Sequence, residues 1–204
     1  MIYLVRHGQT EFNAQGRLQG HVDSPLTEQG VAQAKAFGQT LARLLDQGSA
    51  WQIVSSPLGR AYATAGHIGQ VLGTRNIETD PRLKELSWGD WDGRLRSELQ
   101  TEHSDAFNAS GWAFRTQMGE TYEAVCQRMR HWLDSLPAEA DRRVIAVSHG
   151  IAGRVLRGVY AGLSREKVVT QPVPQDAIFA LSNGTITRID CDPHPLANIM
   201  DRHQ

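Results

Sequence analysis

The chain alternates short apolar runs with longer segments in which apolar positions recur every three or four residues. Three of the short runs, at residues 2–5, 51–56 and 143–149, are rich in β-branched residues and end at polar or turn residues. Such runs are typical of strands that are buried on both faces of a sheet. Each is followed by a segment with helical spacing, so the pattern predicts strands that alternate with helices.

Four segments have the spacing of amphipathic helices. They cover residues 28–45, 58–72, 122–136 and 151–163, and Thr27 is a suitable N-cap for the first of them. Strands alternating with such helices predict an α/β fold, with a mostly parallel central sheet covered by helices on both faces in three α/β/α layers.

The C-terminal part of the chain should contain an antiparallel hairpin. Residues 177–190, AIFALSNGTITRID, form two β-type runs joined by Asn183 and Gly184. An Asn-Gly pair between two such runs is the strongest short-range hairpin signal. We therefore expect one antiparallel C-terminal hairpin strand beside the parallel sheet.

The chain shows no internal repeat, low-complexity segment or linker, so we expect a single domain over residues 1–204. Residues 94–119 are the least regularly patterned segment. Their aromatic side chains, Phe107, Trp112 and Phe114, are suited to cover a ligand site. We interpret this segment as a candidate lid.

Composition narrows the function classes. Hydrophobic residues make up 40% of the chain, and the formal net charge is -1. No apolar run reaches the roughly 18 residues of a membrane span, and no signal-like segment opens the chain. Two cysteines, Cys126 and Cys191, provide neither a disulfide framework nor metal-ligand spacing. We expect a cytoplasmic protein with no membrane or nucleic-acid partner, present as a monomer or homodimer.

Candidate chemistry gathers where the predicted strands end. In open α/β sheets, ligands bind at the carboxyl ends of the strands. Two histidines and two arginines follow three of the predicted strands: Arg6, His7, Arg60 and His149. We therefore expect these four side chains to converge at one edge of the sheet.

This set of side chains suits a phosphoryl group. The guanidinium groups of Arg6 and Arg60 present paired donors to phosphoryl oxygens and stay charged at working pH. A neutral imidazole whose other nitrogen is hydrogen-bonded is a competent nucleophile toward phosphorus. The sequence therefore predicts that His7 becomes a phosphohistidine and that His149 stabilises the transferred charge.

Glycines and a helix start are expected to bring further donors to the phosphoryl group. Each histidine precedes a glycine, Gly8 or Gly150, and Gly8 should let the backbone pass close to a ligand. The helix near Ile151 should direct its N-terminus at the anion. A leaving alkoxide also needs a proton donor.

Three carboxylic acids are candidates for that donor. Glu85, Asp90 and Asp92 lie in the segment RLKELSWGDWDGR, and the spacing alone does not choose among them. Each of the three is also compatible with a solvated acidic loop.

Six blocks of this sequence carry a family resemblance. In chain order they are LVRHGQTEFN, QGHVDSPLTEQGVAQA, SSPLGRAYATA, KELSWGDWDG, GETYEAVCQRMRHWL and VSHG. The ordered set, from Ile2 to Gly150, resembles the histidine phosphatase superfamily, also called phosphoglycerate mutase-like. The resemblance implies a mostly parallel sheet between helices. It also implies transfer of a phosphoryl group to the RHG histidine, here His7, and then to water or another hydroxyl.

The resemblance also implies roles for individual residues. Arg6 and Arg60 match the phosphate-binding arginines, and His149 matches the second histidine of the pocket. Asn13 and Gln19 look like further phosphate or substrate contacts, although both are also ordinary turn-forming residues.

Glu85 matches the general acid of the family. It stands four residues before the glycine of a Glu-x-x-x-Gly-x-Trp block, here Gly89 and Trp91. That role requires a raised pKa, which desolvation by Trp88 and Trp91 would favour. Asp92 stands where many relatives have glutamate.

The superfamily contains both mutases and phosphatases. This chain is shorter than the mutases and has Gln19-Gly20 where they have Gly-Trp, so we favour hydrolysis of small phosphorylated metabolites with release of inorganic phosphate. No metal or cofactor is expected, because the arginines and His149 supply the charge stabilisation. Two alternatives remain open: a 2,3-bisphosphoglycerate-dependent phosphoglycerate mutase, and a non-catalytic protein that binds a phosphoryl ligand.

Other phosphoryl-transfer chemistries lack their residues. Neither cysteine is followed six positions later by an arginine, as a cysteine phosphatase requires, and no lysine follows a glycine, as a P-loop requires. No carboxylate lies at metal-ligand spacing beside His7 or His149.

Overall fold

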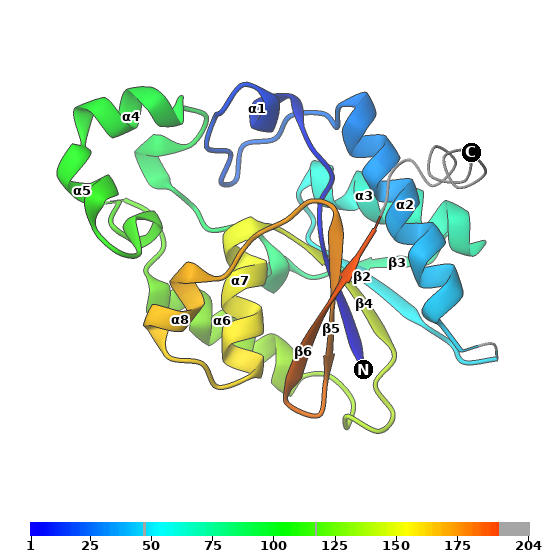
Figure 1. Cartoon of the computed structure of the whole chain (residues 1–204). Helices are drawn as coiled ribbons and strands as arrows, with labels where there is room; N and C mark the ends of the chain where they lie inside the picture. The colour runs from blue at the N-terminus through cyan, green and yellow to red at the C-terminus, as the bar shows by residue number, and fades with distance from the viewer. Residues whose placement is uncertain (47, 117, 192–204) are drawn as a thin grey trace, which may run out of the picture.

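A mixed six-stranded sheet forms the centre of the protein, in the order β3-β2-β4-β1-β5-β6 (Figure 1). The computed structural model describes residues 1–46, 48–116 and 118–191, so residues 192–204 of the expected domain lie outside the described residues. The strands are β1 Ile2–Arg6, β2 Gln52–Ser55, β3 Ile77–Thr79, β4 Val144–Ser148, β5 Ala177–Ser182 and β6 Thr185–Asp190.

Strands β1 to β4 pair in parallel, and the two C-terminal strands are antiparallel. The predicted hairpin is confirmed as β5 and β6, and its turn residues Asn183 and Gly184 have φ angles of 49° and 72°. Strand β5 is also antiparallel to β1. Strand β3 was not expected, because its three residues are only partly buried or exposed and show no apolar run.

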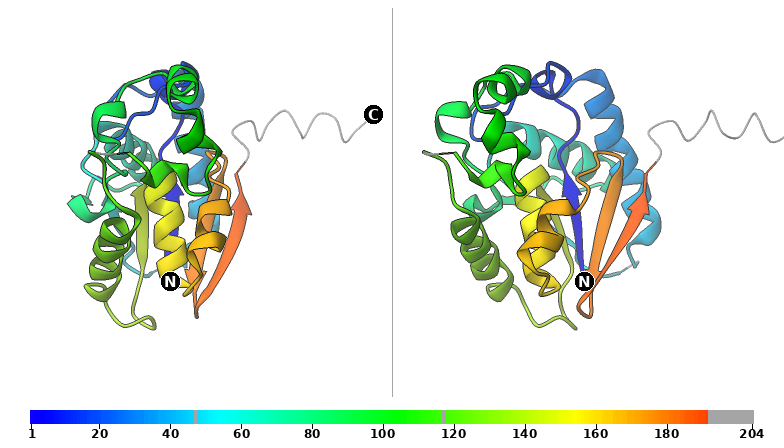
Figure 2. Two further views of the ribbon diagram at one scale, coloured as in Figure 1. Left: turned by 90° about the vertical axis from the view of Figure 1, so that its left-hand side faces the viewer. Right: turned by 60° about the vertical axis from the view of Figure 1, so that its left-hand side comes forward.

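Helices cover both faces of the sheet, as expected from the spacing (Figures 1 and 2). The longer ones are α2 Glu28–Leu44, α3 Gly59–Leu72, α6 Tyr122–Asp134 and α7 Gly150–Tyr160. The shorter ones are α1 Glu11–Ala14, α4 Arg96–Glu102, α5 Ser104–Asn108 and α8 Arg165–Thr170, with 3-10 turns η1 Pro81–Leu83, η2 Gly89–Trp91 and η3 Trp112–Phe114.

Alternation along the strands produces two hydrophobic cores. Tyr3 and Val5 pack in one core with residues of α2 and α3, whereas Ile2 and Leu4 pack in the other with residues of α6 and α7. Successive strand side chains point to opposite faces, so a fully apolar strand such as β1 needs helices on both sides. This is the physical reason for the three layers.

The parallel strands β1, β2 and β4 end side by side. The N–H of His7 donates to the carbonyl of Ser148 at 3.0 Å, and the N–H of Ser56 donates to the carbonyl of Val147 at 2.9 Å. Each of these bonds joins the residue that follows β1 or β2 to the neighbouring strand β4. The strand ends therefore bring the polar residues that follow them to one place.

Candidate active site

A cavity of about 280 Å³ opens at the carboxyl ends of these strands. Most of the predicted site residues line it: Arg6, His7, Asn13, Gln19, Arg60, Glu85 and Gly150. His149 is buried beside it, with its ring centroid 5.1 Å from that of His7. The structure therefore brings together the side chains expected at the strand ends.

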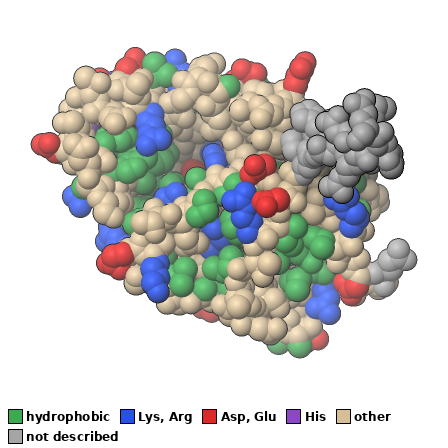
Figure 3. Space-filling model, in the orientation of Figure 1, with side chains coloured by type: hydrophobic (Ala, Val, Ile, Leu, Met, Phe, Trp, Pro, Cys, Tyr) green, Lys and Arg blue, Asp and Glu red, His purple; other side chains and the backbone are tan. Residues whose placement is uncertain are grey.

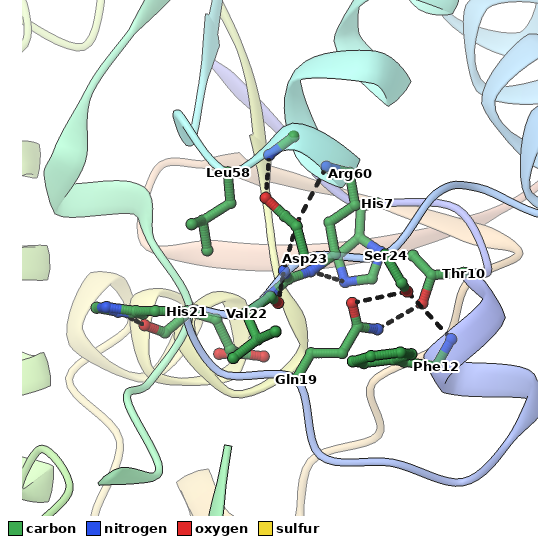
Figure 4. Close-up of polar contacts among 12 residues, drawn as sticks. His7, Thr10, Phe12, Gln19, His21, Val22, Asp23, Ser24, Leu58 and Arg60 are labelled. Atoms are coloured by element: carbon green, nitrogen blue, oxygen red, sulfur yellow. Dashed lines mark hydrogen bonds and ion pairs between the residues drawn. The ribbon is translucent and has the colours of Figure 1, made fainter. Parts of the chain in front are cut away.

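His7 has one nitrogen bound to the backbone and the other directed at an arginine. Its Nδ1 lies 2.8 Å from the carbonyl of Gly8, an acceptor, so Nδ1 carries the proton. Its Nε2 accepts a bond of 3.3 Å from Nε of Arg60 (Figure 4). Burial, helped by the charges of Arg60 and Arg6, lowers the pKa of His7 well below 6.5. His7 is thus a neutral imidazole with its lone pair on Nε2.

Arg60 is held rigidly by acceptors from one loop. Its guanidinium donates to the carboxylate of Asp23 at 2.6 Å and to the carbonyls of Val22 and Gly20 at 2.9 and 2.7 Å (Figure 4). Asp23 also accepts the N–H of Gly59 at 2.6 Å, at the start of α3. Asp23 therefore positions the arginine and caps its helix at the same time.

Asp23 was missed by sequence reasoning. The residue at the N-cap of α3 is Leu58, whose side chain cannot accept a hydrogen bond. That poor cap signals that another group must satisfy the helix N-terminus, but it does not say which one. Only the fold brings a residue 36 positions away in the chain to Gly59.

Arg6 and His149 present unpartnered buried nitrogens. Among the described residues, Nε of Arg6 and Nδ1 of His149 have no hydrogen-bond partner. Another nitrogen of Arg6 donates to the carbonyl of Val173, and burial lowers the pKa of Arg6 to about 10, which leaves it charged near neutral pH. Two buried donors without acceptors fit a bound anion whose oxygens would satisfy them.

Ser56 forms a hydrogen bond with His149. Its hydroxyl accepts the N–H of Leu58 at 3.3 Å and lies 2.8 Å from Nε2 of His149. When the hydroxyl donates to Nε2, Nδ1 of His149 carries the proton. Burial, together with the charge of Arg60, lowers the pKa of His149 well below 6.5. Ser56 was not singled out from the sequence, because a serine after a strand is common.

The side chain of Glu85 is held in place by backbone N–H groups. Its carboxylate accepts the N–H groups of Leu86, Ile151 and Ala152 at 2.9, 3.2 and 2.8 Å. The expectation that the first N–H groups of α7 point directly at the phosphoryl ligand is therefore wrong for two of them. A nearly buried carboxylate requires hydrogen-bond donors, and a helix N-terminus supplies them.

Asn13 and Gln19 line the cavity but also hold its loops together. The side-chain oxygen of Asn13 accepts the N–H of Thr10 and an amide N–H of Gln175, at 3.2 and 3.1 Å. Gln19 donates to the hydroxyl of Thr10 and accepts from Ser24 at 3.4 Å (Figure 4). Both residues therefore shape the rim, whatever contact they make with a ligand.

Gln175 links the loop after α8 to His7. Its amide donates to the carbonyl of His7 and to the side chain of Asn13, both at 3.1 Å. Gln175 lies 168 residues after His7 in the chain, and no local pattern marks it. Sequence reasoning could not have found it without the fold.

The two glycines that follow the histidines have different environments. A Cβ on Gly8 would lie 2.2 Å from the carbonyl oxygen of Gly30, so Gly8 is needed for close packing of the β1–α1 loop on α2. Gly8 does not line the cavity, and the expectation that it faces the ligand is not supported. Gly150 does line the cavity, with its Cβ position 3.5 Å from Cζ of Arg6 and 3.6 Å from a carboxylate oxygen of Glu85.

Two aromatic residues of the candidate lid, Phe107 and Trp112, stack with Trp88 and Trp91, whereas Phe114 contacts Tyr122 edge-on. Consecutive ring centroids are 5.2, 4.4, 5.5 and 5.0 Å apart in the series Trp88, Trp112, Phe107, Trp91 and His103. The first two of these residues line the cavity, and the series continues into α5. Residues of the segment thus form one wall of the site. That they act as a lid stays a prediction.

Neither a metal site nor a membrane helix is found in the described part of the chain. Over residues 1–46, 48–116 and 118–191, no three His, Cys, Asp or Glu side chains are grouped to hold a metal ion. Within the same ranges, no helix has the length and apolar character to cross a membrane.

Comparison with known protein families covers nearly the whole chain. A family model described as histidine phosphatase superfamily (branch 1) matches residues 2–194. The chain is 36% identical over 198 residues to a probable phosphoglycerate mutase GpmB of Erwinia tasmaniensis, covering 95% of this chain and 86% of the relative. A protein of the same name from Yersinia pestis is also 36% identical, over 199 residues.

Solved structures with the same fold include phosphatases. A mycobacterial glucosyl-3-phosphoglycerate phosphatase in complex with VO3 has a TM-score of 0.72 and 28% identity, covering 88% of this chain and 92% of that one. For a putative alpha-ribazole-5'-P phosphatase from Escherichia coli, the TM-score is 0.72 and the identity 26%, over 94% and 95% of the two chains. Bacillus stearothermophilus YhfR has a TM-score of 0.74 and 30% identity, over 93% and 95%.

Proposed function

The chain belongs to the histidine phosphatase superfamily, and from that premise we propose that it is a metal-independent phosphomonoesterase acting on small phosphorylated metabolites through a phosphohistidine on His7. The observation that carries the proposal is the state of His7. It is neutral, its Nδ1–H is held by a backbone carbonyl, and its Nε2 lies against Arg60 in a cavity lined by arginines. A neutral imidazole whose other nitrogen is held by a hydrogen bond is a competent nucleophile toward phosphorus, and the arginines supply donors for phosphoryl oxygens.

In the first step, Nε2 of His7 attacks phosphorus and the bond from phosphorus to the ester oxygen breaks. Glu85 gives its proton to the leaving oxygen. The unpartnered Nε of Arg6 and Nδ1 of His149 are available to bind phosphoryl oxygens, and Arg60 adds positive charge beside the nucleophile. These groups supply the charge stabilisation of the transfer without a metal ion.

In the second step, a water attacks the phosphohistidine and the bond from phosphorus to Nε2 breaks. Glu85, now ionised, accepts the proton of that water, and inorganic phosphate leaves. The base role agrees with the contacts of Glu85, whose carboxylate accepts three backbone N–H groups.

The mutase reaction is the second candidate. It shares the first step but returns the phosphoryl group to another hydroxyl, and the GpmB relatives, at 36% identity, are named probable phosphoglycerate mutases. The phosphatase proposal is supported by the solved neighbours named phosphatases. The presence of both a nucleophile and an acid argues against a protein that only binds phosphoryl ligands.

Release of inorganic phosphate tests the proposal. Wild type, His7→Ala and a control that loses the exposed His131, His131→Ala, are compared on a panel of small phosphomonoesters without added metal. We expect release by wild type and by His131→Ala, and none by His7→Ala. Isomerisation of phosphoglycerates that depends on 2,3-bisphosphoglycerate would favour the mutase, and release by His7→Ala would refute the role of His7.

A further inference from the structure

The cavity contains more positive charge than one phosphoryl group requires. Its lining includes five arginines and a single carboxylate, that of Glu85. Arg6 and Arg60 have the phosphate-binding role proposed above. The other three, Arg17, Arg96 and Arg154, were not singled out by the sequence and have no part in the proposed mechanism.

The charge balance of the site indicates a second anion. Arg60 is paired with Asp23, and Glu85 offsets one further arginine, so three of the five positive charges are left. A phosphoryl dianion would compensate two of them. On the face shown in Figure 3, basic and acidic side chains are interspersed.

None of the three additional arginines forms an ion pair within the described part of the chain. Arg154, in α7, donates from Nη1 to the carbonyl of Val169 at 3.0 Å, and its Nε is buried without a partner. A buried guanidinium nitrogen in a cavity wall is costly unless a ligand completes its hydrogen bonding.

Arg96 and Arg17 are held in place by neutral groups. Arg96 is the first residue of α4, and its Cζ lies 5.1 Å from the ring centroid of Trp112. Arg17 donates to the carbonyl of Gly93 and to the side chain of Gln15, both at 2.9 Å. These contacts orient the guanidinium groups but leave their charges free for a ligand.

We propose that Arg96 and Arg154, assisted by Arg17, form a subsite for a second anionic group on the leaving alcohol. The inference rests on the proposed function and deepens it: the substrates are phosphomonoesters whose alcohol carries a carboxylate or a further phosphoryl group. A guanidinium binds either group through two parallel N–H donors. The wall formed by Trp112 then holds Arg96 facing the leaving group.

Pairs of substrates that differ only in the second anion test the proposal. For the carboxylate, 3-phosphoglycerate is compared with glycerol 3-phosphate, and for the phosphoryl group, glycerol 1,3-bisphosphate is compared with the same monoester. We expect the kcat/KM of wild type to be roughly 10-fold or more higher for 3-phosphoglycerate or for glycerol 1,3-bisphosphate than for glycerol 3-phosphate. A charge-assisted hydrogen bond to the second anion contributes a free energy of this size. Which pair shows the preference identifies the second group.

The variants Arg96→Gln and Arg154→Gln should each reduce that preference by roughly 10-fold. Arg96→Lys should restore part of it, because it keeps the charge. The matched control for Arg96→Gln is Arg165→Gln. Like Arg96, Arg165 is the exposed first residue of a short helix, and its Cζ lies 4.8 Å from the ring centroid of an aromatic residue, Tyr122. Unlike Arg96, Arg165 is outside the cavity. This control should keep the preference of wild type.

Binding of the same compounds is measured by calorimetry alongside turnover. If no ester is hydrolysed, the proposed function fails, and the affinities for 3-phosphoglycerate, glycerol 1,3-bisphosphate and glycerol 3-phosphate still decide the subsite. Tighter binding of an anionic member that is lost in Arg96→Gln supports the proposal. Equal binding and equal kcat/KM for all three compounds, or a preference unchanged in both variants, would overturn it.

Discussion

Mild acid should destabilise this protein through its two buried histidines. Burial holds the pKa values of His7 and His149 well below 6.5 in the folded state, so these imidazoles stay neutral while those of the unfolded chain gain protons. The unfolded state then binds more protons, and stability falls as the pH drops below 6.5. Between about pH 7.5 and about pH 5.5, each histidine should cost about 1.4 kcal/mol of unfolding free energy, and the pair about 2.7 kcal/mol.

Urea unfolding at the two pH values measures this loss. His149→Gln removes one of the two titrating groups. The unfolding free energy of this variant should therefore fall by only about 1.4 kcal/mol between the same pH values, whatever its absolute stability. His131→Gln removes an exposed histidine and controls for the substitution itself. The reasoning is refuted if the unfolding free energy of wild type changes by less than about 0.5 kcal/mol between the two pH values. It is also refuted if His149→Gln shows the same change as wild type.

Three further substitutions test the packing of glycines and of Trp112. Gly8→Ala places a Cβ against the backbone of Gly30 and should destabilise the protein by about 1–3 kcal/mol, whereas Gly66→Ala, within α3 and with open space at its Cβ, should stabilise it by about 0.5–1 kcal/mol. Equal effects in thermal unfolding would contradict this account. Trp112→Ala removes the ring between the cavity and the aromatic stack, and should change relative kcat/KM among substrates more than the inhibition constant of inorganic phosphate. A loss of stability with unchanged preferences would argue that Trp112 is purely structural.

Local pattern was sufficient for most of the fold. The apolar runs of β1, β2 and β4 and the spacing of the four long helices indicated the layers, because burial on both faces makes the middle of a central strand apolar. Strand β3 escaped detection, because three partly exposed residues carry no periodicity. The pairing of β5 with β1 was also not anticipated, since strand order depends on contacts distant in the chain.

The candidate site was predictable from the fold class where its residues follow strands, and from the family resemblance for Asn13, Gln19 and Glu85. The rule that ligands bind at the carboxyl ends of strands selected Arg6, His7, Arg60 and His149 in advance. The partners that orient them come from elsewhere: Asp23 holds Arg60, Ser56 holds His149, and Gln175 binds the carbonyl of His7. No short-range signal marks these partners, because each acts across a loop or a neighbouring strand.

The sequence by itself determined the class of fold and the place of Arg6, His7, Arg60 and His149 at the strand ends, because periodicity and motif order are properties of the chain. The tertiary structure decided the tautomer of His7, the hydrogen bonds that hold Glu85 as an acceptor, and the packing role of Gly8. It also gathered Arg17, Arg96 and Arg154 in one cavity. These features depend on distances between residues far apart in the chain, and only the folded backbone sets those distances.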